Sequence, residues 1–293
     1  MRVNPNYTPE LLNSLWNVEQ QEQNDILELS TGRSVNEPSD NPAAAAADVE
    51  NQAAQGQNDQ YLQNTTDLEG MFQTAQSTLS SVVTALNQAI SAGTEGANSG
   101  LSASNLQSLT QEVQDIQQQV VTLANTSYEG AYLFAGTVNT QPFTLGAGGV
   151  QYNGNSGTNT VPIADGSTMQ SNVPGSQIFL GTTGSVMGLL QQLVTALQSG
   201  NSTSIGDATT AVSSALNYVS QESGFYSNAL SQLNSNQTFL QQETVSLKTQ
   251  DTSLVGVDEA TAATDLSQAT TAQSAALAAI AKVIPQSLLN YLQ

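Results

Sequence analysis

Residues 68–92 read LEGMFQTAQSTLSSVVTALNQAISA, and the spacing of their apolar side chains indicates the fold class. These side chains recur after alternating steps of three and four residues, which places them in a narrow stripe along one side of an α-helix. The stripe consists of Leu68, Phe72, Ala75, Leu79, Val82, Leu86 and Ala89. We therefore predict a helix over about 58–92 whose apolar side packs against other helices.

The same alternation continues on the C-terminal side of this stretch. It runs through 106–123, and a longer stripe over 207–250 predicts a helix of roughly 65 Å at 1.5 Å per residue. A short helix is expected at 186–197. The predicted fold is thus mainly α, with a long helical coiled-coil rod formed by the N- and C-terminal regions of the chain.

The two ends of the chain carry the stripe in a thinner form, which Glu22 and Asp25 interrupt on the N-terminal side. The apolar positions are Leu11, Leu15, Val18 and Leu29 near the start, and Ala262, Leu266, Ala269, Ala276, Ile280 and Val283 near the end. An isolated helix with so small an apolar area is unstable in water. Each end helix therefore needs a partner, and we expect the two end helices to pair with each other first.

Polar residues stand at four positions where the stripes should be apolar, namely Glu222, Asn236, Glu243 and Gln273. Two interpretations are open. The helix contact can simply be hydrated at these points, or the polar residues can select the register, because a polar residue in such a contact costs stability and penalises wrong pairings.

The middle of the chain has a different composition. Gly, Pro, Asn, Ser and Thr crowd residues 137–184, with short apolar pieces at 150–152, 160–163 and 177–180. This pattern is typical of β-hairpins, so we predict a small inserted β-rich domain.

Helix boundaries are indicated near both ends of the chain. Thr8 and Asn41 each precede a proline, which is the pattern of an N-cap followed by the first helical residue. Residues 29–42 and 251–257 are the predicted linkers between the end helices and the rod.

The charge balance excludes several classes of protein. The chain has 4 Lys+Arg against 24 Asp+Glu, which gives a formal net charge of −20, so we expect neither nucleic acid nor a membrane surface as a partner. It contains no Cys and no His, which removes the thiolate nucleophile, the usual general base and the commonest zinc ligands. We expect no catalytic residue, no metal site and no cofactor. No signal peptide or membrane-spanning segment is expected.

Several sequence motifs resemble those of the flagellin family. The stretch LSTGRSVNEPSDNPAA at 29–44 resembles the family's linker after the N-terminal helix, and 265–293 resembles its C-terminal helix and tail. Further motifs are similar to the hook–filament junction branch of that family, namely LANT at 123–126, YLFAGT at 132–137, YNG at 152–154 and NVPG at 172–175.

The resemblance implies a structural adaptor of the flagellum outside the cell. It implies that a ring of like subunits joins the hook, through hook-associated protein 1, to the flagellin of the filament. It also implies export without a cleavable signal peptide, with a cytosolic chaperone bound to the C-terminal region. The apolar stripes of the end helices would then be the assembly seam, because neighbouring copies would bury what one copy cannot.

The resemblance also implies a domain layout. Residues 1–40 would form an inner coiled-coil helix with its linker, and 251–293 a hinge with the second inner helix. Residues 41–136 and 185–250 would form the two halves of the rod, and 137–184 the outer β-rich domain. Three other functions stay open: a flagellin that forms the filament itself, an exported coiled-coil adhesin or tip protein, and, least favoured, an enzyme that relies on carboxylates alone.

Overall fold

The computed structural model describes residues 7–146, 149–181 and 184–291, with side chains described for 9–146, 149–181 and 184–281. The chain divides into a terminal unit, residues 1–57 and 242–293, and a central unit, residues 58–241. Two long helices, α2 (Pro42–Gly96) and α6 (Ser202–Val255), contribute to both units. The fold is mainly α with a small β insert, which confirms the predicted fold class.

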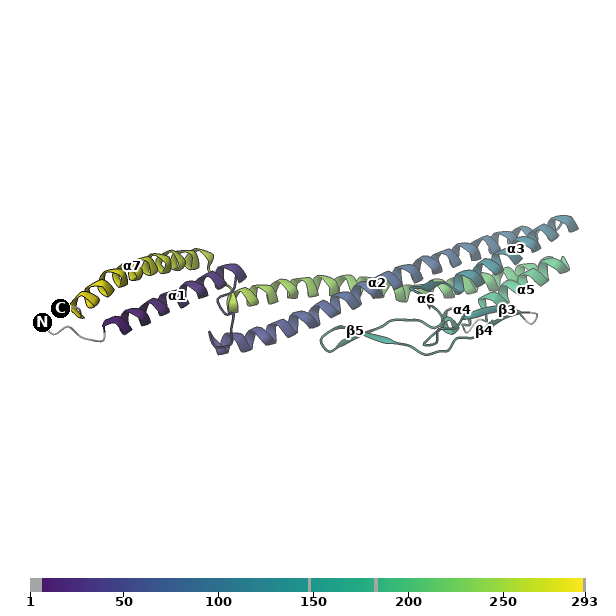
Figure 1. The fold of residues 1–293 in the computed structure, drawn as a ribbon. Helices are drawn as coiled ribbons and strands as arrows, with labels where there is room; N and C mark the ends of the chain where they lie inside the picture. Colours follow the sequence, from purple (N-terminus) through teal and green to yellow (C-terminus); the bar gives the residue numbers. More distant parts are fainter. Residues whose placement is uncertain (1–6, 147–148, 182–183, 292–293) are drawn as a thin grey trace. The chain divides into compact units, whose positions relative to one another are not determined.

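In the central unit, α2 and α6 pack with α3 (Ala103–Ala124) and α5 (Val186–Ser199) (Figure 1). The apolar stripe of 68–92 is buried along its whole length, and the stripe of α6 is buried at Val212, Ala215, Val219 and Leu233. Gly200, in the left-handed conformation at φ 66°, ends α5 and allows the chain to turn directly into α6. The helical core is therefore the one that the three- and four-residue spacing predicts.

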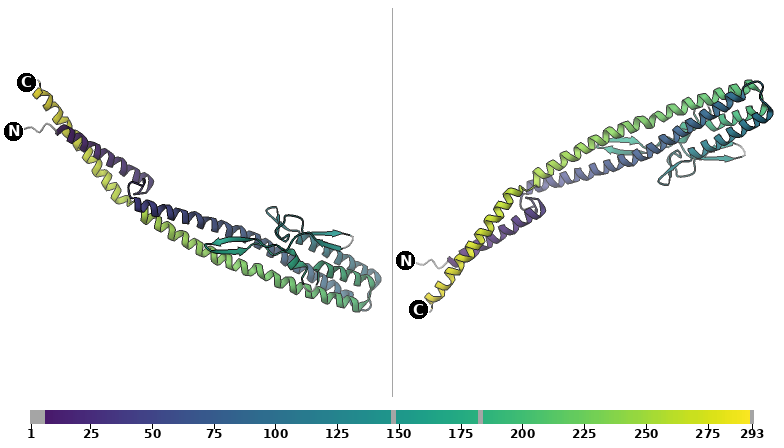
Figure 2. Two further views of the ribbon diagram at one scale, coloured as in Figure 1. Left: turned by 90° about the horizontal axis from the view of Figure 1, so that it is seen from below. Right: turned by 90° about the horizontal axis from the view of Figure 1, so that it is seen from above.

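The β insert consists of three separate antiparallel strand pairs on one side of these helices (Figure 2). They are β1 (Ser127–Tyr128) with β2 (Ala131–Tyr132), β3 (Phe143–Gly146) with β4 (Gly149–Tyr152), and β5 (Thr160–Ala164) with β6 (Ser167–Gln170). A cluster of buried aromatic rings, Phe134, Phe143 and Phe179, fixes the insert to the core through edge-on contacts with centroids 5.2–5.5 Å apart.

Two local predictions are wrong. Residues 177–180 are not a strand, because 175–179 form the short helix α4 (Gly175–Phe179), whose Ile178 and Phe179 are buried in the core. Residues 251–255 are not a linker, because α6 continues to Val255 and the chain breaks only at 256–258. In addition, the helix expected from about 58 begins at Pro42, after Asn41, whose Oδ1 accepts a hydrogen bond from the Ala44 amide at 3.1 Å.

The terminal unit contains α1 (Tyr7–Thr31) and α7 (Glu259–Tyr291), which run antiparallel and pack along each other (Figures 1 and 2). It also contains the N-terminal turns of α2 and the C-terminal turns of α6. Residues 32–41, which we call the connector, link α1 to α2. A small apolar cluster of Val35, Ala44 and Val255 joins the connector to both helices.

Candidate functional site in the terminal unit

The predicted seam lies on the less exposed side of both terminal helices. Ala262 and Ala269 of α7 are buried. The half-buried seam positions are Leu11, Leu15, Val18 and Leu29 on α1, and Leu266, Ala276 and Ile280 on α7. Val283 lies outside the residues whose side chains the structure describes. α1 and α7 contact each other within one chain, and the seam positions are among their less exposed residues.

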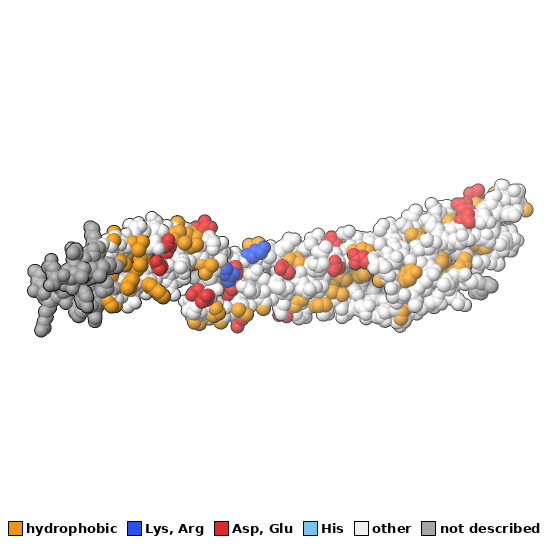
Figure 3. All heavy atoms as spheres, viewed as in Figure 1, with side chains coloured by type: hydrophobic (Ala, Val, Ile, Leu, Met, Phe, Trp, Pro, Cys, Tyr) orange, Lys and Arg blue, Asp and Glu red, His pale blue; other side chains and the backbone are white. Residues whose placement is uncertain are grey.

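A second apolar stripe on α1 is exposed. Leu12, Trp16 and Leu27 are separated by four and eleven residues, which returns each to the same side of a helix. Trp16, the single tryptophan of the chain, is 74% exposed. Hydrophobic side chains are visible over α1 and α7 in the space-filling view (Figure 3). Large apolar side chains exposed on one side of a helix, Trp16 above all, make this side of α1 a candidate protein interaction site.

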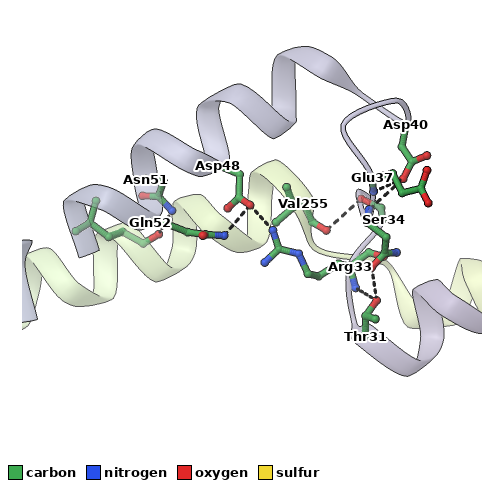
Figure 4. A network of polar contacts seen from close by, with 11 residues as sticks. Thr31, Arg33, Ser34, Glu37, Asp40, Asp48, Asn51, Gln52 and Val255 are labelled. Carbon is green, nitrogen blue, oxygen red and sulfur yellow. Dashed lines mark hydrogen bonds and ion pairs between the residues drawn. The ribbon is translucent and has the colours of Figure 1, made fainter. Parts of the chain in front are cut away.

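The connector is held by a network around Arg33 (Figure 4). Gly32 ends α1 in the left-handed conformation at φ 71°, and the next residue, Arg33, forms an isolated antiparallel bridge with Gly256. The Arg33 guanidinium donates a hydrogen bond to Oδ2 of Asp48 on α2, and Gln52 donates to the same oxygen at 2.9 Å. Asp48 is 6% exposed, so this ion pair is largely removed from water on the carboxylate side.

Backbone hydrogen bonds complete the attachment of the connector. The Ser34 amide donates to the carbonyl of Val255 at 2.7 Å, and the Val257 amide donates to the carbonyl of Gly32 at 3.1 Å. Asp40 closes the connector on itself, because its Oδ2 accepts from the backbone amides of Asn36 and Glu37. The connector therefore joins the N-terminal and C-terminal halves of the chain.

An unpaired carboxylate lies in the contact between the terminal helices. Asp25 of α1 is 7% exposed, and its Oδ2 has no hydrogen-bond partner among the described residues. Burial, and then the negative charge of Asp265 on α7, raise the pKa of Asp25 above its usual range. Burial and the charges of Asp25, Asp40 and Asp265 raise the pKa of Glu28 as well. The contact thus holds negative charge without a matching cation among the residues that the structure describes.

A second carboxylate pair lies beside Arg33. Burial raises the pKa of Asp251 on α6, and the neighbouring carboxylate of Asp48 raises it further, while Arg33 acts in the opposite direction. Oδ1 of Asp48 is buried and has no hydrogen-bond partner in the described part of the chain.

The first turn of α7 is capped by Asp258. Its Oδ1 accepts from the backbone amides of Ala260 at 3.0 Å and Thr261 at 3.4 Å. These hydrogen bonds favour the ionised carboxylate and hold the pKa of Asp258 below its usual range. Asp258 therefore defines where α7 begins after the break at 256–258.

The four predicted polar positions have different environments. Asn236 is half-buried and donates to the carbonyl of Ile163 at 2.7 Å and to the Thr65 hydroxyl at 3.3 Å, so it ties β5 to the two long helices. Glu222 is half-buried and accepts from the Gln177 amide at 2.7 Å. Glu243 is exposed, and Gln273 is half-buried on α7.

Three buried polar residues of α2 were not predicted from the sequence. Asn51 and Asn58 donate to the carbonyls of Leu247 and Leu240 on α6 at 3.0 and 2.9 Å, and Thr65 is fully buried. These three positions continue the row of Phe72, Leu79 and Leu86 backwards in steps of seven. That spacing is the signal that could have found them, because every seventh residue returns to the same side of a paired helix.

Among the residues that the structure describes, no group of three or more His, Cys, Asp or Glu side chains is arranged to hold a metal ion. In the same part of the chain, no helix has the length and apolar character needed to cross a membrane.

Family models match both ends of the chain. The bacterial flagellin N-terminal helical region matches residues 6–139, and the bacterial flagellin C-terminal helical region matches residues 209–292. Flagellar hook-associated protein 3 of Salmonella typhimurium is 35% identical over 158 residues, which are 53% of this chain and 49% of that protein. The match thus spans about half the length of this curated relative.

Solved structures share the fold. A putative flagellar hook-associated protein from Vibrio parahaemolyticus matches with a TM-score of 0.69 at 19% identity, over 73% of this chain and 99% of that chain. The flagellar junction protein FlgL from Legionella pneumophila matches with a TM-score of 0.61 at 14% identity, over 72% of this chain and 100% of that chain. With both flagellin helical regions matched in order, at the two ends that pair as α1 and α7, this chain belongs to the flagellin family.

Proposed function

We propose that this chain is a structural adaptor of the bacterial flagellum that joins the hook to the flagellin filament outside the cell. The observation that carries the proposal is the 35% identity to a hook-associated protein over 158 residues, in a chain whose two ends match the flagellin helical regions. The absence of His and Cys agrees with a role that needs no catalysis.

The terminal unit is the proposed assembly element. Its seam positions hold α1 against α7, and the exposed stripe of Leu12, Trp16 and Leu27 supplies apolar area that one copy leaves in water. Burial of such area among neighbouring copies would stabilise a ring of like subunits. On this proposal, residues 1–40 form an inner coiled-coil helix with its linker, and 251–293 contain the end of α6, a hinge and the second inner helix. Residues 41–136 and 185–250 form the rod, and 137–184 the outer domain.

The proposed partners follow from this position in the flagellum. One side of the ring contacts hook-associated protein 1, and the other side contacts flagellin. Before export, without a cleavable signal peptide, a cytosolic chaperone covers the C-terminal region. The polar positions Glu222, Asn236, Glu243 and Gln273 are proposed to set the register of the helices, and Asn236 has the hydrogen bonds that suit this role.

Removal of the gene from the source bacterium tests the function. We expect electron micrographs to show hooks without filaments and flagellin released into the medium, with both defects reversed by the full-length chain. Cells that keep attached filaments after removal would contradict the proposal.

A flagellin that forms the filament itself is the second candidate, because the two matching family models describe flagellin regions. Copy number distinguishes the two. An adaptor ring requires a small number of copies per flagellum, whereas a filament requires thousands. Quantitative mass spectrometry of sheared flagella, with flagellin and hook protein as internal standards, measures this ratio directly.

A further inference from the structure

We propose that the terminal unit is an acid-strengthened clasp, in which the aspartate pairs Asp25–Asp265 and Asp48–Asp251 each lie between the N-terminal half of the chain and the C-terminal half and repel each other less when one member binds a proton. The proposal concerns the fold of one copy and does not depend on the flagellar role.

The first pair lies between α1 and α7. Asp25 is buried, and its Oδ2 lacks a hydrogen-bond partner among the described residues. The charges that act on it are Asp265 on α7 and Glu28 of its own helix, and Asp40 on the connector acts in turn on Glu28. Glu22 lies one turn earlier on the same side of α1. Every one of these groups is acidic, so ionisation of Asp25 weakens the contact that the seam positions stabilise.

The second pair lies between α2 and α6. Asp48 is buried, one of its oxygens is occupied by Arg33 and Gln52, and the other has no partner among the described side chains. Asp251 faces that carboxylate. Arg33 is the cation next to this pair, and Lys248 is exposed on α6 three residues before Asp251. One guanidinium therefore stands against two carboxylates.

The two pairs share the same construction. In each pair a buried aspartate on the N-terminal half has one carboxylate oxygen without a donor, and a less buried aspartate on the C-terminal half faces it. A proton bound by either member removes one negative charge from the pair and so removes the repulsion between its two carboxylates. In the Asp48–Asp251 pair, where the two side chains are within hydrogen-bond reach, the protonated member also donates to the other carboxylate, and Oδ1 of Asp48 gains the donor that it lacks.

The direction of the pH dependence follows from linkage. Asp25 and Asp251 each have a raised pKa in the folded chain, so the folded state binds more protons than the unfolded state between the ordinary value of about 3.9 and the raised value. Stability of the terminal unit therefore increases as the pH falls through this window. The added stability is complete below the ordinary value and is lost as the pH rises through the raised value.

Cleavage by trypsin after Arg33 reports on the clasp in the full chain. Asparagine imitates the protonated aspartate, because it is neutral, and at position 251 its amide can also donate to Oδ1 of Asp48. At pH 7.5, we expect Asp25→Asn and Asp251→Asn each to slow this cleavage by about threefold or more, because each variant removes the repulsion within its pair and lowers the population of the opened state. Asp67→Asn, which removes an exposed charge from α2 in the central unit, is the matched control and should leave the rate unchanged.

The same experiment can overturn the proposal. Cleavage of the double variant Asp25→Asn/Asp251→Asn at the wild-type rate or faster would show that repulsion within the aspartate pairs does not weaken the terminal unit. Slower cleavage of the wild-type chain on addition of CaCl₂ or MgCl₂ alone, to the level of the double variant, would show that a divalent cation and not a proton serves these carboxylates, which also overturns it.

Hydrogen–deuterium exchange measures how the stability of the terminal unit depends on pH. Peptides that cover the connector should be about threefold or more better protected at pH 4.5 than at pH 7.5, after correction for the intrinsic exchange rate. The double variant should lose this difference. Equal protection of the wild-type chain at both pH values would contradict the proposal. Peptides from the first turn of α7 are left out, because the lowered pKa of Asp258 acts in the opposite direction.

Discussion

Arg33 of the connector donates a hydrogen bond from its guanidinium to Oδ2 of Asp48 in the second turn of α2. The bridge of Arg33 to Gly256 aligns the same residue with the end of α6. One residue therefore links α1, α2 and α6, through its side chain to Asp48 and through its backbone bridge to Gly256. With 4 Lys+Arg in 293 residues, such a contact has few substitutes.

We expect Arg33→Gln to destabilise the terminal unit by about 1–3 kcal/mol, because the buried Asp48 loses its charged donor. The change is measured as loss of exchange protection in the connector, at pH 7.5. Lys248→Gln removes an exposed cation from the same unit and serves as the control. Equal protection in both variants would show that the ion pair contributes nothing.

The cap of α7 is tested at Asp258. We expect Asp258→Ala to weaken the first turn of α7, whereas Asp258→Ser, which can still cap, should weaken it less. The lowered pKa of Asp258 means that its capping contribution is present above the ordinary aspartate value and is lost as the pH falls through the lowered value. Exchange of the Ala260 and Thr261 amides measures the effect. An alanine variant with unchanged exchange would be inconsistent with a capping role.

Packing of α4 is tested by a pair of glycine substitutions. A Cβ at Gly175 would lie 2.7 Å from the carbonyl oxygen of Phe134 and 2.9 Å from the Phe143 ring, so Gly175→Ala should destabilise the central unit by about 1–3 kcal/mol. Gly224 lies within α6 and has open space, so Gly224→Ala should stabilise the same unit by about 0.5–1 kcal/mol. Urea unfolding followed by circular dichroism gives both values, and equal signs would refute the packing argument.

The assembly seam is tested at Ile280. We expect Ile280→Asp to prevent incorporation into flagella while the purified chain keeps its helical circular dichroism, because a charge is placed in the half-buried contact of α1 and α7. Ala281→Asp adds the same charge one residue further, where the side chain is exposed, and should assemble. Incorporation of both variants at the same level would argue against the seam.

The helical core could be predicted because its signal is strong and local. The stripe from Leu68 to Ala89 is a regular run of apolar residues, and each of its members is buried. By contrast, Asn51 and Asn58 occupy equivalent positions of the same helix, but amide side chains carry no apolar signal. Their burial depends on hydrogen bonds to α6, nearly two hundred residues away in the sequence, which no local pattern contains.

Residues 177–180 show why a local apolar signal can be present and still predict the wrong element. A short apolar run between glycines has the same pattern in a strand and in a buried helical turn. The structure selects the helix because Phe179 packs edge-on against Phe134 and Phe143 from other segments. The aspartate pairs could not be predicted from the sequence for a similar reason. Asp25 and Asp265 come near each other only when α1 and α7 pair, and no local pattern contains that pairing.

The role of the paired ends in joining hook and filament is tested most directly by truncation. A chain that lacks residues 266–293, expressed in cells without the full-length gene, removes most of α7 and leaves the central unit intact. We expect electron micrographs to show hooks without attached filaments. Immunoblots should show that the cells contain as much of the truncated chain as of the full-length chain. Normal filaments on these cells would contradict this role of the paired ends.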